Sequence, residues 1–301
     1  MDYDVFKNLV LEQLEADIPE PKTISVQILK KNNGIVHDGV VIREGSINIT
    51  PVIHLDFYYD MYCEGCSFQE AYNDILEKYY QNKSAVNIDM DFFSNFQSIK
   101  NTLAVKLINY EENSQLLTSV PYKRFLDLAI VFYSFLPMAG GSGTNATILI
   151  RSEHISQWGV TTEELYNIAM GNAMRIQPPK LDDINNVVEE ITSDMPQNAF
   201  PQNTARSACP MFILSNESNL FGASCILYNN LLKSFADSIN MDFFVLPSSI
   251  HEVILVPTVN CEGMDDLSRI VRDVNATQLQ HEEILSNHAY DFSREENLIT
   301  M

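Results

Sequence analysis

The order in which short apolar runs, turns and amphipathic helices alternate along the chain constrains its fold more than any other feature. Two β-type runs joined by a turn and followed by a helix occur near residues 24–81, 126–175 and 243–275. Strands joined by short turns pair antiparallel, and a following helix buries its apolar side against the sheet. We therefore predict an α+β fold of mainly antiparallel sheets, with covering helices on one face. The three segments share no residue pattern, so they do not form a repeat.

Turn and capping residues place several elements. Asn32-Asn33-Gly34 separates two β-type runs and predicts a hairpin, because Asn and Gly adopt positive φ at little cost. The apolar run from Ile47 to Leu55 predicts a further strand. Two capping boxes open the clearest helices, Ser67 with Glu70 and Thr161 with Glu164.

The domain organisation is predicted from length and local composition. A chain of 301 residues suits one large domain or two lobes. Residues 195–208 contain two prolines, several Asn and Gln and no apolar period, which is typical of a linker. We predict an N-terminal α+β lobe over 1–194, a linker at 195–208 and a C-terminal βαββα lobe over 209–301.

The charge balance excludes some classes of partner. The chain has 40 acidic and 19 basic residues, a net charge of −21. Its densest basic clusters, Lys30-Lys31 and Lys123-Arg124, are too small for the basic stripe that binding to nucleic acid or an anionic membrane needs. We expect no direct nucleic-acid binding and no membrane binding. The acidity itself is explained either by solubility or by an acidic surface that mimics nucleic acid and binds a basic protein.

Cysteine usage and the N-terminus indicate the compartment. Five cysteines, an odd and sparse set, do not make a disulfide framework. Met1-Asp2-Tyr3-Asp4 lacks the basic start and apolar run of a signal peptide, and the apolar stretch Leu126–Met138 is too short to span a bilayer. We expect a cytoplasmic protein.

Cofactor motifs fail on inspection. Gly141–Ala146 fits a dinucleotide fingerprint, but the strand-like Thr147–Ile150 follows where a helix N-terminus is needed. We therefore predict a hairpin loop there. His251-Glu252 and His281-Glu282 each lack a second histidine four residues after the first. No cofactor is predicted.

Cys63 and Cys66 form a C-x-x-C pair whose spacing suits zinc or a redox couple. No second pair completes four ligands, and His54 is the only close histidine. The two are therefore weak metal candidates, and the alternative is two ordinary cysteines in a turn.

The segment around Ser248, Ser249, His251 and Glu252 is the strongest catalytic candidate. It offers a nucleophile, a base and an orienting acid in one connection between strands. Residues so close in sequence rarely converge, because alternate strand residues point to opposite faces. The alternative is a polar turn whose histidine is satisfied locally.

Two distant residues complete the catalytic hypothesis. Asp127 is a further weak catalytic candidate, and Arg151 is a cation that could meet the same pocket. Convergence of Asp127 and Arg151 with Ser248, Ser249 and His251 in one cleft would favour catalysis.

Several segments together resemble a domain-of-unknown-function family found widely in anaerobic gut Firmicutes. The most specific segment is Pro247-Ser248-Ser249-Ile250-His251-Glu252. The others are Lys31–Gly34, Asp38-Gly39, Ile49–Pro51, Lys106–Tyr110, Val120-Pro121, Arg124–Ala129, Trp158–Thr161, Leu220–Ala223 and Val274–Thr277. The resemblance spans nearly the whole chain and implies no activity or catalytic residue.

These observations favour a cytosolic binding or interaction protein without catalysis, whose partner is another protein or a small ligand. The first alternative is a hydrolase or nucleotide-modifying enzyme that uses the Ser248–Glu252 turn. The second alternative is the acidic nucleic-acid mimic.

Overall fold

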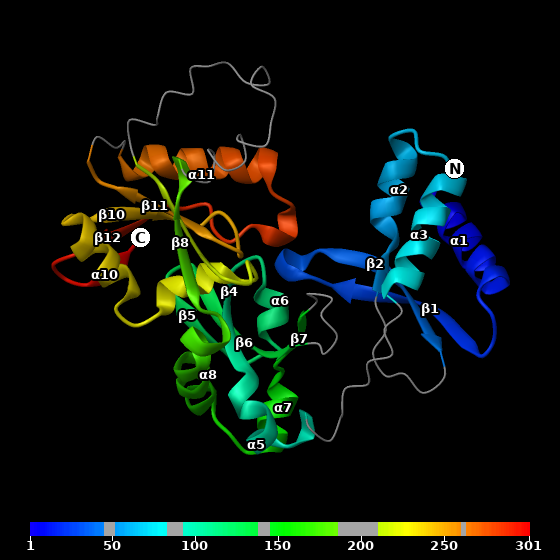
Figure 1. The fold of residues 1–301 in the computed structure, drawn as a ribbon, viewed down its shortest axis with the longest axis horizontal. Coiled ribbons are helices and arrows are strands. Elements are labelled where there is room, and N and C mark those ends of the chain that lie inside the picture. Colours follow the sequence, from blue (N-terminus) through cyan, green and yellow to red (C-terminus); the bar gives the residue numbers. More distant parts are fainter. Residues whose placement is uncertain (45–51, 83–92, 138–144, 186–209, 260–262) are drawn as a thin grey trace. The chain divides into compact units, whose positions relative to one another are not determined.

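The computed structural model describes residues 1–44, 52–82, 93–137, 145–185, 210–259 and 263–301 (Figure 1). The chain divides into two compact units, Met1–Phe93 and Ser94–Met301, here called unit 1 and unit 2. All strand pairs of the described residues are antiparallel, and helices pack on the sheets, so the fold is α+β as predicted.

The described residues of unit 1 form a three-stranded sheet, three α-helices and one 3-10 turn. Its elements are α1 (Tyr3–Asp17), β1 (Lys22–Lys30), η1 (Asn32–Gly34), β2 (Val36–Glu44), β3 (Val52–His54), α2 (Leu55–Cys63) and α3 (Phe68–Asn82), and the strand order is β1-β2-β3. The predicted hairpin is confirmed, because β1 pairs with β2 from Lys22–Glu44 to Lys30–Val36. Asn33 and Gly34 in its turn have φ of 56° and 70°.

The core of unit 1 lies between the sheet and its helices. Phe6, Val10 and Leu14 of α1 pack with Val40 and Ile42 of β2 and with the buried faces of α2 and α3. Residues 47–51 of the strand predicted over 47–55 lie outside the described residues. The end of this prediction is wrong, since β3 stops at His54 and Leu55 begins a helix. Leu55 and Tyr58 are both buried, and their spacing of three residues suits a helix.

Unit 2 begins with a four-stranded sheet. Its elements are α5 (Phe96–Ile99), η2 (Lys100–Thr102), β4 (Leu103–Asn109), α6 (Ser114–Leu117), β5 (Tyr122–Phe125), β6 (Leu128–Pro137), β7 (Asn145–Leu149), α7 (Ser152–Trp158) and α8 (Thr162–Ile176). The long strand β6 pairs with β4 along one edge and with β5 and β7 along the other. Part of the predicted Gly141–Ala146 loop lies outside the described residues, but the antiparallel pairing of β6 and β7 fits a hairpin there.

A six-stranded sheet completes unit 2, in the order β13-β12-β10-β11-β9-β8. Its elements are β8 (Pro179–Asp183), β9 (Phe212–Asn216), η3 (Gly222–Leu227), α10 (Leu231–Ile239), β10 (Phe243–Leu246), β11 (Val253–Pro257), α11 (Met264–Gln278), η4 (His281–Glu283), β12 (Tyr290–Ser293) and β13 (Leu298–Thr300).

Both faces of the six-stranded sheet are covered, which corrects the prediction of helices on one face. Leu267 and Val271 of α11 pack with Leu246 of β10. Phe235 of α10 instead contacts the ring of Phe243 edge-on, with centroids 5.0 Å apart. Since residues 243 and 246 differ by an odd number, their side chains point to opposite faces of the strand. Figure 1 shows α11 and α10 on different sides of this sheet.

The units of the structure differ from the predicted lobes 1–194 and 209–301. Strands β8 and β9 flank the predicted linker and pair from Pro179–Asn216 to Asp183–Phe212, so chain from both sides of it belongs to one sheet. Residues 195–208 themselves lie outside the described residues. Among the helices that the structure describes, none has the length and apolar character needed to cross a membrane.

Candidate functional site: a hollow between α8 and the end of η3

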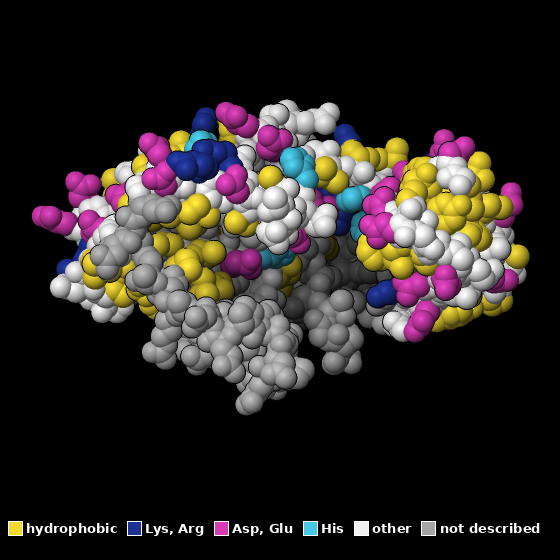
Figure 2. Space-filling view, turned by 90° about the horizontal axis from the view of Figure 1, so that it is seen from above, with side chains coloured by type: hydrophobic (Ala, Val, Ile, Leu, Met, Phe, Trp, Pro, Cys, Tyr) yellow, Lys and Arg dark blue, Asp and Glu magenta, His cyan; other side chains and the backbone are white. Residues whose placement is uncertain are grey.

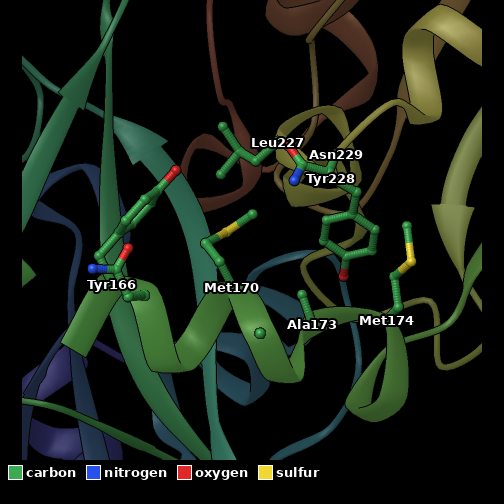
Figure 3. Close-up of a pocket in the computed structure, with 9 residues that line it drawn as sticks. Tyr166, Met170, Ala173, Met174, Leu227, Tyr228 and Asn229 are labelled. Atoms are coloured by element: carbon green, nitrogen blue, oxygen red, sulfur yellow. The ribbon is translucent and has the colours of Figure 1, made fainter. Parts of the chain in front are cut away.

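A hollow of about 420 Å³ lies in unit 2 between α8 and the end of η3 with the two residues that follow it. One wall consists of Tyr166, Asn167, Met170, Gly171, Ala173 and Met174 of α8, and the other of Leu227, Tyr228 and Asn229. Figure 3 shows the side chains of the two walls facing each other. This volume is within the range of sites that hold small ligands, roughly 300–1,000 Å³.

The sequence of α8 explains its wall. The Thr161–Glu164 capping box fixes the start of the helix, as predicted, with the Thr161 hydroxyl accepting from the Glu164 N–H. Leu165, Ala169 and Ala173 then form the buried stripe of the helix. The next stripe is displaced by one residue and consists of Tyr166, Met170 and Met174, so it faces the hollow beside the buried stripe.

The α8 wall is apolar and adaptable. Met174 is 50% exposed and Met170 is half-buried. Unbranched thioether side chains adjust to ligands of different shape. Gly171 leaves further room, because a Cβ added there would meet nothing within 4 Å. Lys123 lies 4.0 Å from the centroid of the Tyr166 ring and pairs with Glu163 at 2.9 Å, so its charge is compensated.

The opposite wall is tied to the end of α8 through Gln177, the C-cap residue of that helix, which is buried. Its backbone oxygen accepts from the Tyr228 hydroxyl at 3.1 Å, and its amide Nε2 donates to the Leu220 oxygen at 2.8 Å. Burial raises the pKa of Tyr228, so this hydroxyl stays protonated and can donate. One residue therefore joins α8 to both ends of the η3 segment, through its backbone oxygen and its side-chain amide.

The start of η3 has an unusual backbone. Phe221 has φ of 56°, which is an outlier for a bulky residue. Its N–H donates to His251 Nδ1 at 3.3 Å, and the two rings stack with centroids 5.8 Å apart. Lys106 Nζ of β4 lies 4.5 Å from the centroid of the same phenyl ring. A Cβ on Gly222 would lie 2.5 Å from the His251 oxygen, so only glycine fits there.

The structure places the predicted catalytic turn between β10 and β11, where its polar groups bond mainly to backbone. Ser249 is 3% exposed, and its hydroxyl accepts from the His251 N–H at 3.0 Å. The Ser215 hydroxyl donates to the His251 oxygen at 2.8 Å, and the Ser248 oxygen accepts from the Leu285 N–H. These contacts are those of a polar turn, but the His251 ring bonds to the distant Phe221 and not locally, as the polar-turn alternative expected.

Asp127 is linked to the turn indirectly through Ser286, whose N–H donates to the Pro247 oxygen at 2.9 Å. The Asp127 carboxylate accepts from the Ser286 hydroxyl at 2.7 Å and from the Tyr290 hydroxyl at 2.5 Å. Arg151 is exposed at the N-cap of α7. Among the described residues, no side-chain hydrogen bond or ion pair connects Asp127 or Arg151 with the Ser248–Glu252 turn.

In the C-x-x-C pair, Cys63 is the last residue of α2 and Cys66 lies in the turn before α3. Cys63 is exposed, Cys66 is half-buried, and neither is in a disulfide. Burial and the neighbouring Glu70 carboxylate raise the pKa of the Cys66 thiol, which lowers its thiolate fraction and its value as a ligand or nucleophile. Within the described ranges, no three His, Cys, Asp or Glu side chains gather as a metal site would require.

The hollow was not predicted from the sequence, although its α8 wall has a recognisable pattern of residues. Tyr166, Met170 and Met174 recur every four residues directly beside the stripe Leu165, Ala169 and Ala173. A second apolar stripe on an otherwise amphipathic helix indicates a second contact surface. The opposite wall, residues 227–229, is about 60 residues away and has no comparable periodicity.

The fold and the hollow define an α+β protein with antiparallel sheets and a concave site of small-ligand size. The chain belongs to the family described as "Family of unknown function (DUF5688)", which matches residues 3–294. This confirms the resemblance to a domain-of-unknown-function family. Searches of curated proteins and of solved structures found no match.

Proposed function

We propose that the chain is a cytoplasmic binding protein without catalytic activity, and that it takes a neutral apolar group into the hollow between α8 and the end of η3. The group belongs either to a small molecule or to a side chain of a partner protein. The observation that carries this proposal is the facing arrangement of Tyr166, Met170 and Met174 with Leu227 and Tyr228 around about 420 Å³.

The lining favours a neutral occupant. The polar side-chain groups of the lining are the amides of Asn167 and Asn229 and the hydroxyls of Tyr166 and Tyr228, all of them uncharged. The Lys123 ammonium beside Tyr166 is paired with Glu163. A charged ligand would leave water without a compensating charge, which is costly in a partly apolar site. A neutral apolar group would gain free energy from burial against the methionines.

The hydrogen bonds of the Ser248–Glu252 turn support a binding function over hydrolysis. A hydrolase needs a base that points at its nucleophile. Here His251 Nδ1 instead accepts from the Phe221 N–H, and the Ser249 hydroxyl accepts from a backbone N–H. His251 therefore holds the start of the η3 segment, and Ser249 holds the backbone of the turn itself.

The distribution of charge supports a partner other than nucleic acid. Figure 2 shows acidic side chains spread over the visible described surface, with lysine and arginine in small groups. With a net charge of −21 and without a broad basic field on that face, phosphates would be repelled. An acidic surface that mimics nucleic acid and binds a basic protein stays an alternative prediction.

A dye titration with a matched pair of variants tests the proposal. Nile red is neutral and apolar, and it becomes fluorescent in apolar sites. We expect saturable binding to the wild type and to Gly171→Ala, whose single methyl group leaves the hollow open. Gly171→Leu directs a larger side chain into the same space, so binding should weaken at least tenfold.

Both variants add helix propensity to α8, so a loss of folding does not explain a difference between them. Equal Nile red affinity for Gly171→Ala and Gly171→Leu would contradict the proposed site. Saturable hydrolysis of an ester, phosphoester or peptide substrate that depends on His251 would contradict the absence of catalysis.

A further inference from the structure

The two walls of the hollow and the His251 turn are joined by one continuous set of hydrogen bonds. The His251 ring holds the N–H of Phe221, the preceding Leu220 oxygen accepts from Gln177, and the Gln177 oxygen accepts from Tyr228. Tyr228 lines the hollow, and Gln177 ends the helix that forms the other wall. A change at His251 can therefore affect the hollow through these consecutive hydrogen bonds.

The contact between His251 and Phe221 depends on the charge of the imidazole. Nδ1 accepts a hydrogen bond, so the proton of the neutral ring is on Nε2. A protonated imidazole has N–H groups at both nitrogens and cannot accept. Protonation would leave the Phe221 N–H without its acceptor and would set a second cation against a phenyl ring that already has the Lys106 ammonium 4.5 Å from its centroid.

Loss of this contact would affect the backbone conformation of Phe221. A phenylalanine with φ of 56° persists only where its surroundings hold it. The adjoining Gly222 is pressed against Ser215 and the His251 backbone, so the segment cannot shift toward the turn. Once the Phe221 N–H is released, the peptide group that it shares with the Leu220 oxygen can turn, and this oxygen is the acceptor for Gln177 Nε2. The Ala223 N–H still donates to the Ile250 oxygen at 3.3 Å, so the change begins at this peptide group.

We propose that His251 is a positioning residue for the hollow, and that adding a proton to its ring releases Phe221 and moves the wall formed by Leu227, Tyr228 and Asn229. The movement depends on the hydrogen bonds and the Phe221 backbone, and it does not require the proposed function. Its consequence, weaker binding at acid pH, rests on the proposed function.

Other charged and titratable groups lie around this contact. Lys106 of β4 contacts Phe221, Glu252 is next to His251 in the turn, and the Glu283 oxygen of η4 accepts from the Ile250 N–H. Tyr133 of β6 contacts the Phe221 ring and Cys225 belongs to η3. Burial raises the pKa of both, that of Cys225 to about 12, so neither changes charge in acid. Histidine is the side chain that gains charge between pH 8 and pH 5.

The test follows the methyl groups of Met170 and Met174 by NMR in protein labelled with [methyl-¹³C]methionine, between pH 8 and pH 5 and without ligand. In the wild type both methyl resonances should move with one midpoint, equal to the midpoint of the His251 ring signals. His251→Asn keeps an acceptor oxygen near the Nδ1 position but does not titrate, so both resonances should stay near their pH 8 positions.

The matched control is His288→Asn, which removes an exposed histidine of unit 2 and should leave the titration of both methyl groups unchanged. Static resonances in the wild type, a midpoint different from that of His251, or full movement in His251→Asn would each overturn the inference. The wild-type comparison of midpoints decides the matter even where a variant does not fold. Failure of Nile red to bind would contradict the proposed function and leave this titration intact.

Discussion

The contact of Asp127 with Tyr290 allows a quantitative prediction about unit 2. The Tyr290 side chain is fully buried, and its hydroxyl donates to Asp127 Oδ1 at 2.5 Å, within the range of charge-assisted O–H···O⁻ bonds. Asp127 follows β5, and Tyr290 begins β12, so the contact joins the four-stranded sheet to the six-stranded sheet. Tyr290→Phe removes only the hydroxyl and keeps the packing of the ring.

Hydrogen bonds to charged groups contribute about 1.5–3 kcal/mol, and Asp127 is only half-buried, so we expect Tyr290→Phe to lower the free energy of unfolding by about 2 kcal/mol. The matched comparison is Tyr228→Phe, which removes a buried hydroxyl bonded to the neutral Gln177 oxygen. Its expected cost is about 1 kcal/mol. Trp158, the single tryptophan, lies in unit 2, so its fluorescence during urea unfolding reports on this unit.

A double-mutant cycle isolates the contact. Asp127→Asn and Tyr290→Phe should together cost clearly less than the sum of the single changes, with a coupling free energy of about 1–2 kcal/mol. Additive effects, or a cost of Tyr290→Phe below that of Tyr228→Phe, would refute the reasoning that the carboxylate strengthens this bond.

Three further outcomes are expected. The tyrosines should not change the free energy of unfolding below about pH 10. Above that pH they should lower it by up to about 1.4 kcal/mol per pH unit for each buried tyrosine, because the unfolded chain ionises there while the raised pKa keeps the folded tyrosine neutral. Urea unfolding at pH 9 and pH 11 checks this, and equal stability would contradict it; the tyrosines with the largest upward shifts are Tyr3, Tyr58, Tyr72, Tyr133, Tyr228 and Tyr290. A fluorophosphonate probe should leave Ser248 and Ser249 unlabelled, whereas Ser249→Ala should cost about 1 kcal/mol of stability; labelling that needs His251 would refute the structural role. Purified protein should contain no stoichiometric zinc by elemental analysis, and zinc lost on changing Cys63 or Cys66 would show the opposite.

The elements that were predicted correctly depend on neighbours in sequence. The Asn32-Asn33-Gly34 hairpin and the Thr161–Glu164 capping box are formed within a few residues, so the residue types are sufficient to place them. The strand predicted over 47–55 failed at Leu55, because a short apolar run suits a strand and a helix equally until its neighbours are known.

What escaped prediction depends on distant segments. Composition around 195–208 indicates a connection but not that β8 and β9 pair across it. The Ser248–Glu252 turn was located correctly, yet its partners Ser215, Phe221 and Leu285 come from other elements, and these decide whether His251 acts as a base or holds a loop. The hollow likewise requires residues 227–229 to lie beside α8, and no local sequence pattern predicts that contact.

The most direct measurement of the central claim uses the methionine methyl spectrum at pH 8 during addition of a neutral aromatic probe such as indole. Binding in the hollow should move the resonances of Met170 and Met174 saturably and leave those of Met61 in unit 1 and Met241 beside α10 in place. Gly171→Leu should abolish the change, and Gly171→Ala should keep it. Resonances of Met170 and Met174 that stay fixed at saturating probe, or that move no more than those of Met61 and Met241, would contradict the claim that this hollow is a binding site.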